Sequence, residues 1–120
     1  MLSRILAVDD EPDLRYLMRR IFERAGHEVT VAGHGDAALL AVRASPPDLV
    51  VTDMMMPVMG GVELIRRLRA DPLTAKIPIL AATGDAPLAG DADAVLAKPY
   101  RPAELLTAAN ALLTQKADRA

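Results

Sequence analysis

Apolar residues are grouped along the chain in five short runs, which are separated by stretches of mixed character. The runs are rich in Val, Ile, Leu and Ala, and they predict strands at residues 5–8, 27–32, 49–53, 77–82 and 94–97. Continuous apolar runs of this length are typical of strands buried on both faces, as in a parallel sheet. The run at 27–32 is more polar than the others, which favours a position at the edge of the sheet.

The stretches between these runs carry a helical pattern. Pro12 stands where a helix tolerates a missing N–H, and apolar residues then recur every three or four positions. The apolar face is formed by Leu14, Leu17, Met18, Ile21, Phe22 and Ala25, and the opposite face by Arg15, Arg19, Arg20, Glu23 and Arg24. Gly26 ends this helix. Similar patterns predict helices at 37–44 and 62–70, and a final helix from Pro102 onward.

Strand and helix alternate along the whole chain, which indicates an α/β fold with a parallel sheet and helices on both faces. A length of 120 residues fits one domain, 1–120, in which we expect residues 115–120 to form a flexible tail. Because strand-to-strand crossovers are right-handed, all the loops that lead from a strand to a helix meet at one edge of the sheet. Ligands bind at that edge, outside the carboxyl ends of the strands.

The composition narrows the possible functions. The chain has no cysteine, which excludes a disulfide framework, a thiolate zinc site and a cysteine nucleophile. The formal net charge of −2 gives no overall attraction to nucleic acid or to a membrane surface. No apolar run approaches the roughly 18 residues that would span a bilayer, and no signal peptide precedes the first strand. We therefore expect a cytoplasmic protein.

Charged and polar residues stand where the predicted strands end. Asp9 and Asp10 follow the first strand, Asp53 ends the third, Thr83 follows the fourth and Lys98 follows the fifth. Acids that converge repel one another, and a hard divalent cation such as Mg²⁺, which prefers oxygen ligands, removes that repulsion. Lysine and threonine are suited to contact a phosphoryl group, and an aspartate can act as a nucleophile that forms an acyl phosphate. The pattern predicts a magnesium site beside a phosphorylated aspartate.

Each of these residues also has an ordinary structural explanation. Asp9 and Asp10 could simply cap a helix. Thr83 could simply begin a turn, and Lys98 could be a solvated lysine before a proline. Taken one at a time, these explanations are the more common ones. What indicates a shared site is that all of them occur at successive strand ends of one alternating chain.

Together, these motifs resemble the receiver domain of bacterial two-component response regulators, a flavodoxin-like (CheY-like) family. The resemblance covers nearly the whole chain. It rests on Val8-Asp9-Asp10-Glu11, on Asp53-Met54-Met55-Met56-Pro57 with Gly60-Gly61, on Thr83, and on Lys98-Pro99-Tyr100. The resemblance implies a five-stranded parallel sheet in the order 2-1-3-4-5.

The resemblance also implies a role for each carboxylate. Asp53 would accept a phosphoryl group from a phosphohistidine of a histidine kinase or a phosphotransfer protein. Asp10, Asp53 and the main-chain carbonyl of Met55 would bind Mg²⁺, and Asp9 would help through water.

The remaining motifs complete the implied switch. Lys98 would pair with the phosphoryl group and Thr83 would move towards it on activation, and the Lys98–Pro99 peptide bond is expected to be cis. Such a domain is not a conventional enzyme, because it catalyses only its own phosphorylation and dephosphorylation. Its partner downstream would be another protein, with no direct contact to nucleic acid or to a membrane.

The chain departs from the family at two places. An aromatic residue usually stands three positions before the lysine, and here that position is Val95, which has no ring to rotate on activation. Only residues 84–92 connect Thr83 to Asp93, whereas a crossover needs about 10–12 residues or more. We therefore expect the fourth helix of the family to be missing or reduced to a turn. We also expect residues 84–92 to be mobile and to become ordered on phosphorylation.

Other functions can be weighed against this one. A phosphatase of the haloacid dehalogenase type needs a second acid two residues after the nucleophile, where this chain has Met55. A flavodoxin needs a phosphate-binding loop after the first strand, where Asp9-Asp10-Glu11 would repel a phosphate. A nucleic-acid patch could be built from Arg66, Arg67 and Arg69, but these fit the solvated face of the third helix better. A phosphate-independent, receiver-like interaction module stays open as the alternative.

Overall fold

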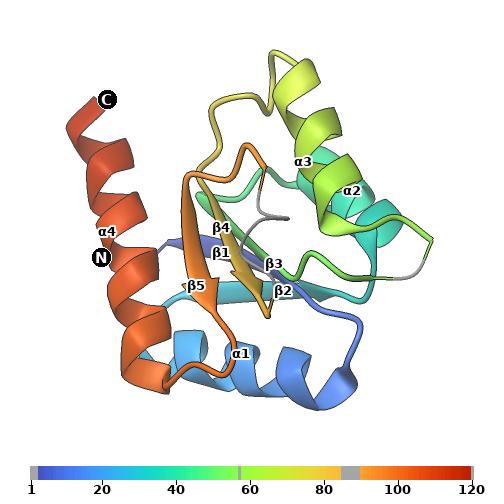
Figure 1. The fold of residues 1–120 in the computed structure, drawn as a ribbon. Helices are drawn as coiled ribbons and strands as arrows, with labels where there is room; N and C mark the ends of the chain where they lie inside the picture. The colour runs from blue at the N-terminus through green and yellow to red at the C-terminus, as the bar shows by residue number, and fades with distance from the viewer. Residues whose placement is uncertain (1–2, 57, 85–89, 120) are drawn as a thin grey trace.

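The strands form a single parallel sheet whose order is the one expected from the resemblance (Figure 1). The structure is a computed structural model that describes residues 3–56, 58–84 and 90–119. The strands are β1 (Arg4–Val8), β2 (Glu28–Ala32), β3 (Leu49–Thr52), β4 (Ile79–Thr83) and β5 (Ala94–Ala97). They lie in the order β2-β1-β3-β4-β5, and all neighbours are parallel. The predicted topology is therefore confirmed, and β2 is an edge strand as its polar pattern indicated.

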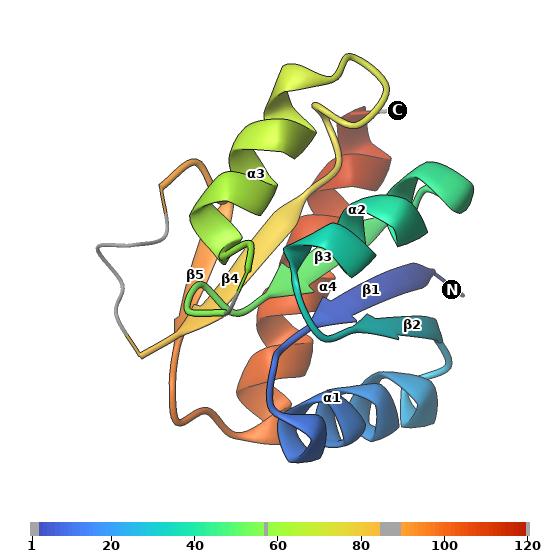
Figure 2. The same cartoon turned by 90° about the vertical axis from the view of Figure 1, so that its right-hand side faces the viewer.

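The described residues contain four helices, which cover both faces of the sheet. They are α1 (Pro12–Arg24), α2 (Gly35–Ala44), α3 (Gly61–Ala70) and α4 (Pro102–Arg119). Helices α1 and α4 lie on one face, and α2 and α3 lie on the other (Figures 1 and 2). Among the residues described, no helix combines the length and the apolar character needed to cross a bilayer.

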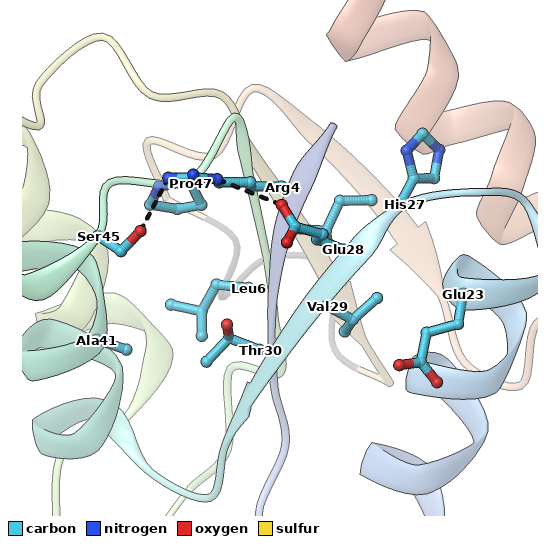
Figure 3. Close-up of a pocket in the computed structure, with 11 residues that line it drawn as sticks. Arg4, Leu6, Glu23, His27, Glu28, Val29, Thr30, Ala41, Ser45 and Pro47 are labelled. Carbon is cyan, nitrogen blue, oxygen red and sulfur yellow. Dashed lines mark hydrogen bonds and ion pairs between the residues drawn. The ribbon is translucent and has the colours of Figure 1, made fainter. Parts of the chain in front are cut away.

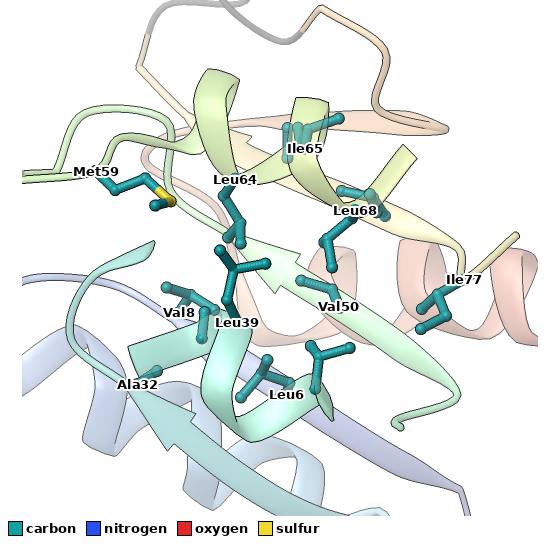
Figure 4. Close-up of a cluster of buried hydrophobic side chains, with 14 of the residues drawn as sticks. Leu6, Val8, Ala32, Leu39, Val50, Met59, Leu64, Ile65, Leu68 and Ile77 are labelled. Carbon is teal, nitrogen blue, oxygen red and sulfur yellow. The ribbon is translucent and has the colours of Figure 1, made fainter. Parts of the chain in front are cut away.

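The sheet separates two layers of buried apolar side chains. Because successive residues of a strand point to opposite faces, each apolar run serves both layers. Leu6 and Val50 pack with Leu64 and Leu68 of α3 in the layer shown in Figure 4. The other layer joins the sheet to α1 and α4, and includes Ile5, Val51, Met18, Phe22, Leu105 and Leu112. Because both faces of the strands are buried, each strand appears in the sequence as a continuous apolar run.

The described end of the fourth crossover is tied to β4 and α3 through Asp93. Residues 84, 90, 91 and 93 form bends or turns. Residues 85–89, which make up most of the segment 84–92 that we expect to be mobile, lie outside the described residues. The carboxylate of Asp93 accepts the Ile79 N–H at 2.7 Å and Nη2 of Arg69 at 2.6 Å. Arg69 also donates to the main-chain carbonyls of Ala75 and Ile77. The prediction that Arg69 belongs to a solvated helix face is therefore wrong.

The C-terminal helix continues to Arg119, past Gln115, where we expected a flexible tail to begin. Nζ of Lys116 lies 2.8 Å from Oδ1 of Asp48, which immediately precedes β3. The other carboxylate oxygen of Asp48 accepts the main-chain N–H of Arg4 at 2.8 Å. The last turns of α4 thus have a tertiary partner that the local pattern of residues 115–120 does not reveal.

Candidate functional site

Three carboxylates meet at the carboxyl ends of β1 and β3. One ligand oxygen from each of Asp9, Asp10 and Asp53 lies within 4.8 Å of the others. The sheet register explains this, because Val8 pairs with Thr52 and the aspartates follow directly after these two residues. The main-chain N–H of Asp53 donates to the carbonyl of Val8 at 2.9 Å, which extends the pairing to the site itself. The structure therefore brings together the three acids that the sequence placed at strand ends.

Lys98 adds one positive charge to this cluster. Its Nζ atom lies 2.9 Å from Oδ2 of Asp9 and 3.5 Å from Oδ2 of Asp53. Burial by itself lowers the pKa of Lys98, but the hydrogen bond to Asp9 and the charges of Asp9 and Asp53 outweigh it, so the pKa is raised. Lys98 is therefore a cation at neutral pH. The Lys98–Pro99 peptide bond is cis, as expected from the resemblance.

The side chain of Asp53 is held in a defined direction. Its Oδ1 atom accepts the N–H of Met54 at 2.7 Å, which leaves Oδ2 facing Lys98. The start of α3 packs directly against this main chain. A Cβ atom on Gly61 would lie 2.5 Å from the carbonyl oxygen of Asp53 and 2.8 Å from Cα of Met54. Only glycine fits there, which explains Gly61 in the motif.

The neighbouring carboxylates of Asp9 and Asp10 differ in the hydrogen bonds and ion pairs that they make. Asp9 is buried, with 1% of its surface exposed, and both carboxylate oxygens are occupied. Its Oδ1 atom accepts the N–H of Glu11 at 3.0 Å, and its Oδ2 atom pairs with Lys98. The carboxylate of Asp10 is more open, and it makes no hydrogen bond or ion pair with any residue that the structure describes. Asp10 is therefore the acid with the most free ligand capacity.

The main chain of Asp9 is held as well, by a residue that the sequence analysis did not assign to the site. Its N–H donates to the carbonyl of Ala32 at 3.1 Å, and its carbonyl accepts Nη1 of Arg15 at 2.8 Å. We predicted Arg15 on the outer, polar face of the first helix. The sequence does place Arg15 near the start of the helix that follows Asp9, and this position could have indicated a contact with the site.

Thr83 and Met55 complete the set of predicted residues. Thr83 is buried at the end of β4, and its carbonyl accepts the main-chain N–H of Lys98 at 3.0 Å. In the pairing of β4 with β5 it lies opposite Ala97, next to Lys98. Met55 follows Asp53 by two residues, and 66% of the residue's surface is exposed. The role of its main-chain carbonyl stays a prediction.

The donor set fits a divalent cation. Three carboxylates and one ammonium group leave two negative charges in a partly buried cluster. All the available ligand atoms are oxygens, which suits Mg²⁺ better than a softer metal. Like charges this close destabilise the fold unless a cation neutralises them. The chemistry of the cluster therefore agrees with the predicted magnesium site.

Two cavities of the described region lie away from the acidic cluster. One, of about 470 Å³, is lined by Arg4, His27, Glu28 and Ser45 beside the amino ends of β1 and β2 (Figure 3). The other, of about 630 Å³, lies beside Arg69 and α4. Neither is lined by the strand-end residues. The three carboxylates and Lys98 thus lie apart from both of these cavities.

Comparison with known proteins agrees with this geometry. The family description "response regulator receiver domain" matches residues 5–110. The DNA-binding response regulator MtrA of Mycolicibacterium smegmatis is 37% identical over 98% of this chain and 54% of its own length. The phosphate regulon transcriptional regulatory protein PhoB of Rhizobium meliloti is 38% identical over 94% of this chain and 53% of its own length. The chain thus spans about half the length of the curated relatives that it matches.

Two solved structures show the same fold over nearly their whole length. A putative response regulator from Chloroflexus aurantiacus superposes with a TM-score of 0.89 at 33% identity, covering 95% of this chain and 99% of that one. The chemotaxis protein CheY4 of Vibrio cholerae superposes with a TM-score of 0.88 at 29% identity, covering 93% and 99%. From its sequence, its fold and its strand-end acids, the chain belongs to the response regulator receiver domain family.

Proposed function

We propose that this receiver domain accepts a phosphoryl group on Asp53 from the phosphohistidine of a histidine kinase or a phosphotransfer protein. The observation that carries the proposal is the contact of Lys98 with both Asp9 and Asp53 at an edge where three carboxylates meet. A lysine ammonium held there is a point charge that suits a phosphoryl group, and the acids beside it suit a divalent cation.

Asp53 is the best nucleophile of the three acids. Both oxygens of Asp9 are engaged and the residue is almost fully buried. Asp53 is held by one oxygen and presents the other toward Lys98. A nucleophile that is oriented in advance loses less freedom on reaching the transition state. The carboxylate of Asp10 is free to serve as a metal ligand instead.

The transfer exchanges one bond to phosphorus for another. A carboxylate oxygen of Asp53 forms the new O–P bond as the P–N bond of the phosphohistidine breaks, and the departing imidazole takes up a proton. Lys98 balances the negative charge of the phosphoryl oxygens, and the hydroxyl group of Thr83 donates to one of them. Asp10, Asp53 and the carbonyl of Met55 would hold Mg²⁺, with Asp9 acting through water; the ion would supply charge neutralisation.

The domain would catalyse only its own phosphorylation and dephosphorylation and would act as a switch for another protein. Val95, which has no ring, lies on β5 with 44% of its surface exposed. The readout therefore involves the Thr83 end of the short crossover and not a rotating aromatic side chain. We propose that the domain works in the cytoplasm and contacts neither nucleic acid nor a membrane directly.

Phosphorylation can be tested by intact mass. Wild type incubated with Mg²⁺ and acetyl phosphate, or with a phosphorylated kinase, should gain one phosphoryl group, and Asp53→Asn should gain none. Asp36→Asn, which removes an exposed acid from α2, is a matched control and should be labelled like wild type. Labelling that survives in Asp53→Asn would refute the assignment. A wild type that no donor labels would favour the phosphate-independent interaction module.

A further inference from the structure

Arg15, near the start of α1, lies across the ends of β1 and β2. Its Nη1 atom donates to the carbonyl oxygen of Asp9 at 2.8 Å. The guanidinium also lies against Gly33, where a Cβ atom would be 3.0 Å from that same nitrogen. Gly33 follows the last residue of β2. The absence of a side chain at Gly33 therefore leaves the room that the Arg15 side chain occupies.

The carbonyl that Arg15 holds belongs to the peptide between Asp9 and Asp10. Asp9 is already fixed, since its main-chain N–H and both carboxylate oxygens have partners. The carboxylate of Asp10 has no such partner in the described part of the chain. Its direction is therefore set by the main chain on either side of it. The Asp9 carboxylate holds the N–H of Glu11 after it, and Arg15 holds the carbonyl of Asp9 before it.

We propose that Arg15 is a positioning residue for the magnesium site: it holds the Asp9–Asp10 peptide and so directs the Asp10 carboxylate toward the cation. This inference rests on the proposed function, because it requires Asp10 to bind the metal. Groups that orient a metal ligand typically change metal affinity by about 10–100-fold when they are removed. We expect the lower end of that range, because Arg15 acts through a peptide and not on the ligand atom itself.

Charge and orientation have opposite effects here, which makes the role testable. A guanidinium near a cation site repels the cation, so a purely electrostatic role predicts tighter Mg²⁺ binding when Arg15 is removed. A positioning role predicts weaker binding, because the Asp10 carboxylate must then be ordered when the metal binds. The sign of the change in affinity distinguishes the two roles.

The experiment measures the Mg²⁺ dissociation constant by calorimetry, and separately the free energy of unfolding in Mg²⁺-free buffer. Arg15→Met keeps an unbranched side chain but removes the N–H donors, and its dissociation constant should rise about ten-fold. Arg15→Lys keeps a charge and a donor and should recover part of the affinity. The matched control is Arg19→Met, which changes an exposed arginine one turn further along α1. This variant should bind Mg²⁺ like wild type.

A second variant perturbs the same contact from the other side. Gly33→Val places a side chain where the Arg15 guanidinium lies, so it should weaken Mg²⁺ binding in the wild-type background. In the Arg15→Met background the same substitution should have no effect on Mg²⁺ affinity, because the residue that it displaces is gone.

Each outcome has a distinct meaning. Arg15→Met that binds Mg²⁺ as tightly as wild type, or more tightly, overturns the positioning role even if the variant is less stable. Equal effects of Gly33→Val in both backgrounds also overturn it. A wild type that binds no Mg²⁺, or that binds equally well as Asp10→Ala, overturns the proposed metal site first and this inference with it.

Discussion

Among single residues, Lys98 is the one whose pairing with a buried carboxylate can be tested by its effect on stability. Its pKa is raised, so its pairing with Asp9 contributes fully below its ordinary pKa of 10.5 and is lost only as the pH rises through the higher folded value. Lys98→Ala would leave Asp9 buried with one unpaired oxygen. We expect the free energy of unfolding in Mg²⁺-free buffer at pH 7 to fall by about 1–3 kcal/mol, measured by urea denaturation. An unchanged denaturation midpoint would contradict this pairing.

The same substitution separates metal binding from signalling. The predicted metal ligands are oxygens of other residues, so Lys98→Ala should still bind Mg²⁺. It should lose most of the NMR shift changes that beryllofluoride, a phosphoryl mimic, causes in wild type, because Lys98 is the cation that faces Asp53. A full set of these shift changes in the variant would show that another group carries the response.

Among the secondary-structure elements, the Arg69–Asp93 pair links α3 to the residue that precedes β5. One carboxylate oxygen of Asp93 joins the start of β4 to the end of α3, through the Ile79 N–H and Arg69. Asp93→Ala leaves both donors without this acceptor, so we expect a loss of about 1–3 kcal/mol in unfolding free energy.

The matched control for this pair is Asp91→Ala. It removes the same charge two residues earlier, and only the main-chain carbonyl of Asp91 contacts Arg69. Chemical denaturation of the two variants should show a loss of stability for Asp93→Ala alone. Similar losses in both would mean that the effect comes from net charge and not from the pair.

At the scale of the whole molecule, Asp48 ties together segments that are far apart in the sequence. It accepts the N–H of Arg4 at the start of β1 and pairs with Lys116 near the end of α4. Burial raises the pKa of Asp48, but the hydrogen bonds from Arg4 and Lys116 outweigh it, and the net pKa lies below the ordinary value of 3.8. Its contribution to stability is therefore present above that value and is lost as the pH falls through the lower folded pKa.

This contribution can be followed by acid titration. The difference in unfolding free energy between wild type and Asp48→Ala should be constant from pH 6 to pH 7 and should shrink as the pH falls below 3.8. Hydrogen exchange of α4 should also rise near Lys116 in the variant, because its last turns lose their partner. A difference that does not depend on pH would mean that packing, and not the charge, accounts for the role of Asp48.

The pattern of residues predicted a parallel α/β fold and the position of the acids, and the family resemblance supplied the strand order. Alternating apolar runs and amphipathic stretches allow few arrangements once crossovers are right-handed, and these rules place every strand end on one edge. Asp9, Asp53 and Lys98 could therefore be assigned to one site before any contact was known, because each follows directly after a strand. The same reasoning gives the expectation that no regular helix fits after Thr83, because the number of connecting residues limits the structure that they can form.

The partners of the long side chains, in contrast, became known only from the packed fold. Helical periodicity placed Arg15 and Arg69 on polar faces, and in the fold each reaches across to main-chain carbonyls of another segment. It also assigned Leu17 to the apolar face, but 44% of that residue is exposed. Periodicity gives the direction in which a side chain leaves its helix, whereas a flexible arginine finds its partner among groups that only the packed elements bring near. The same reason explains why Lys116 has a partner that no local pattern predicts.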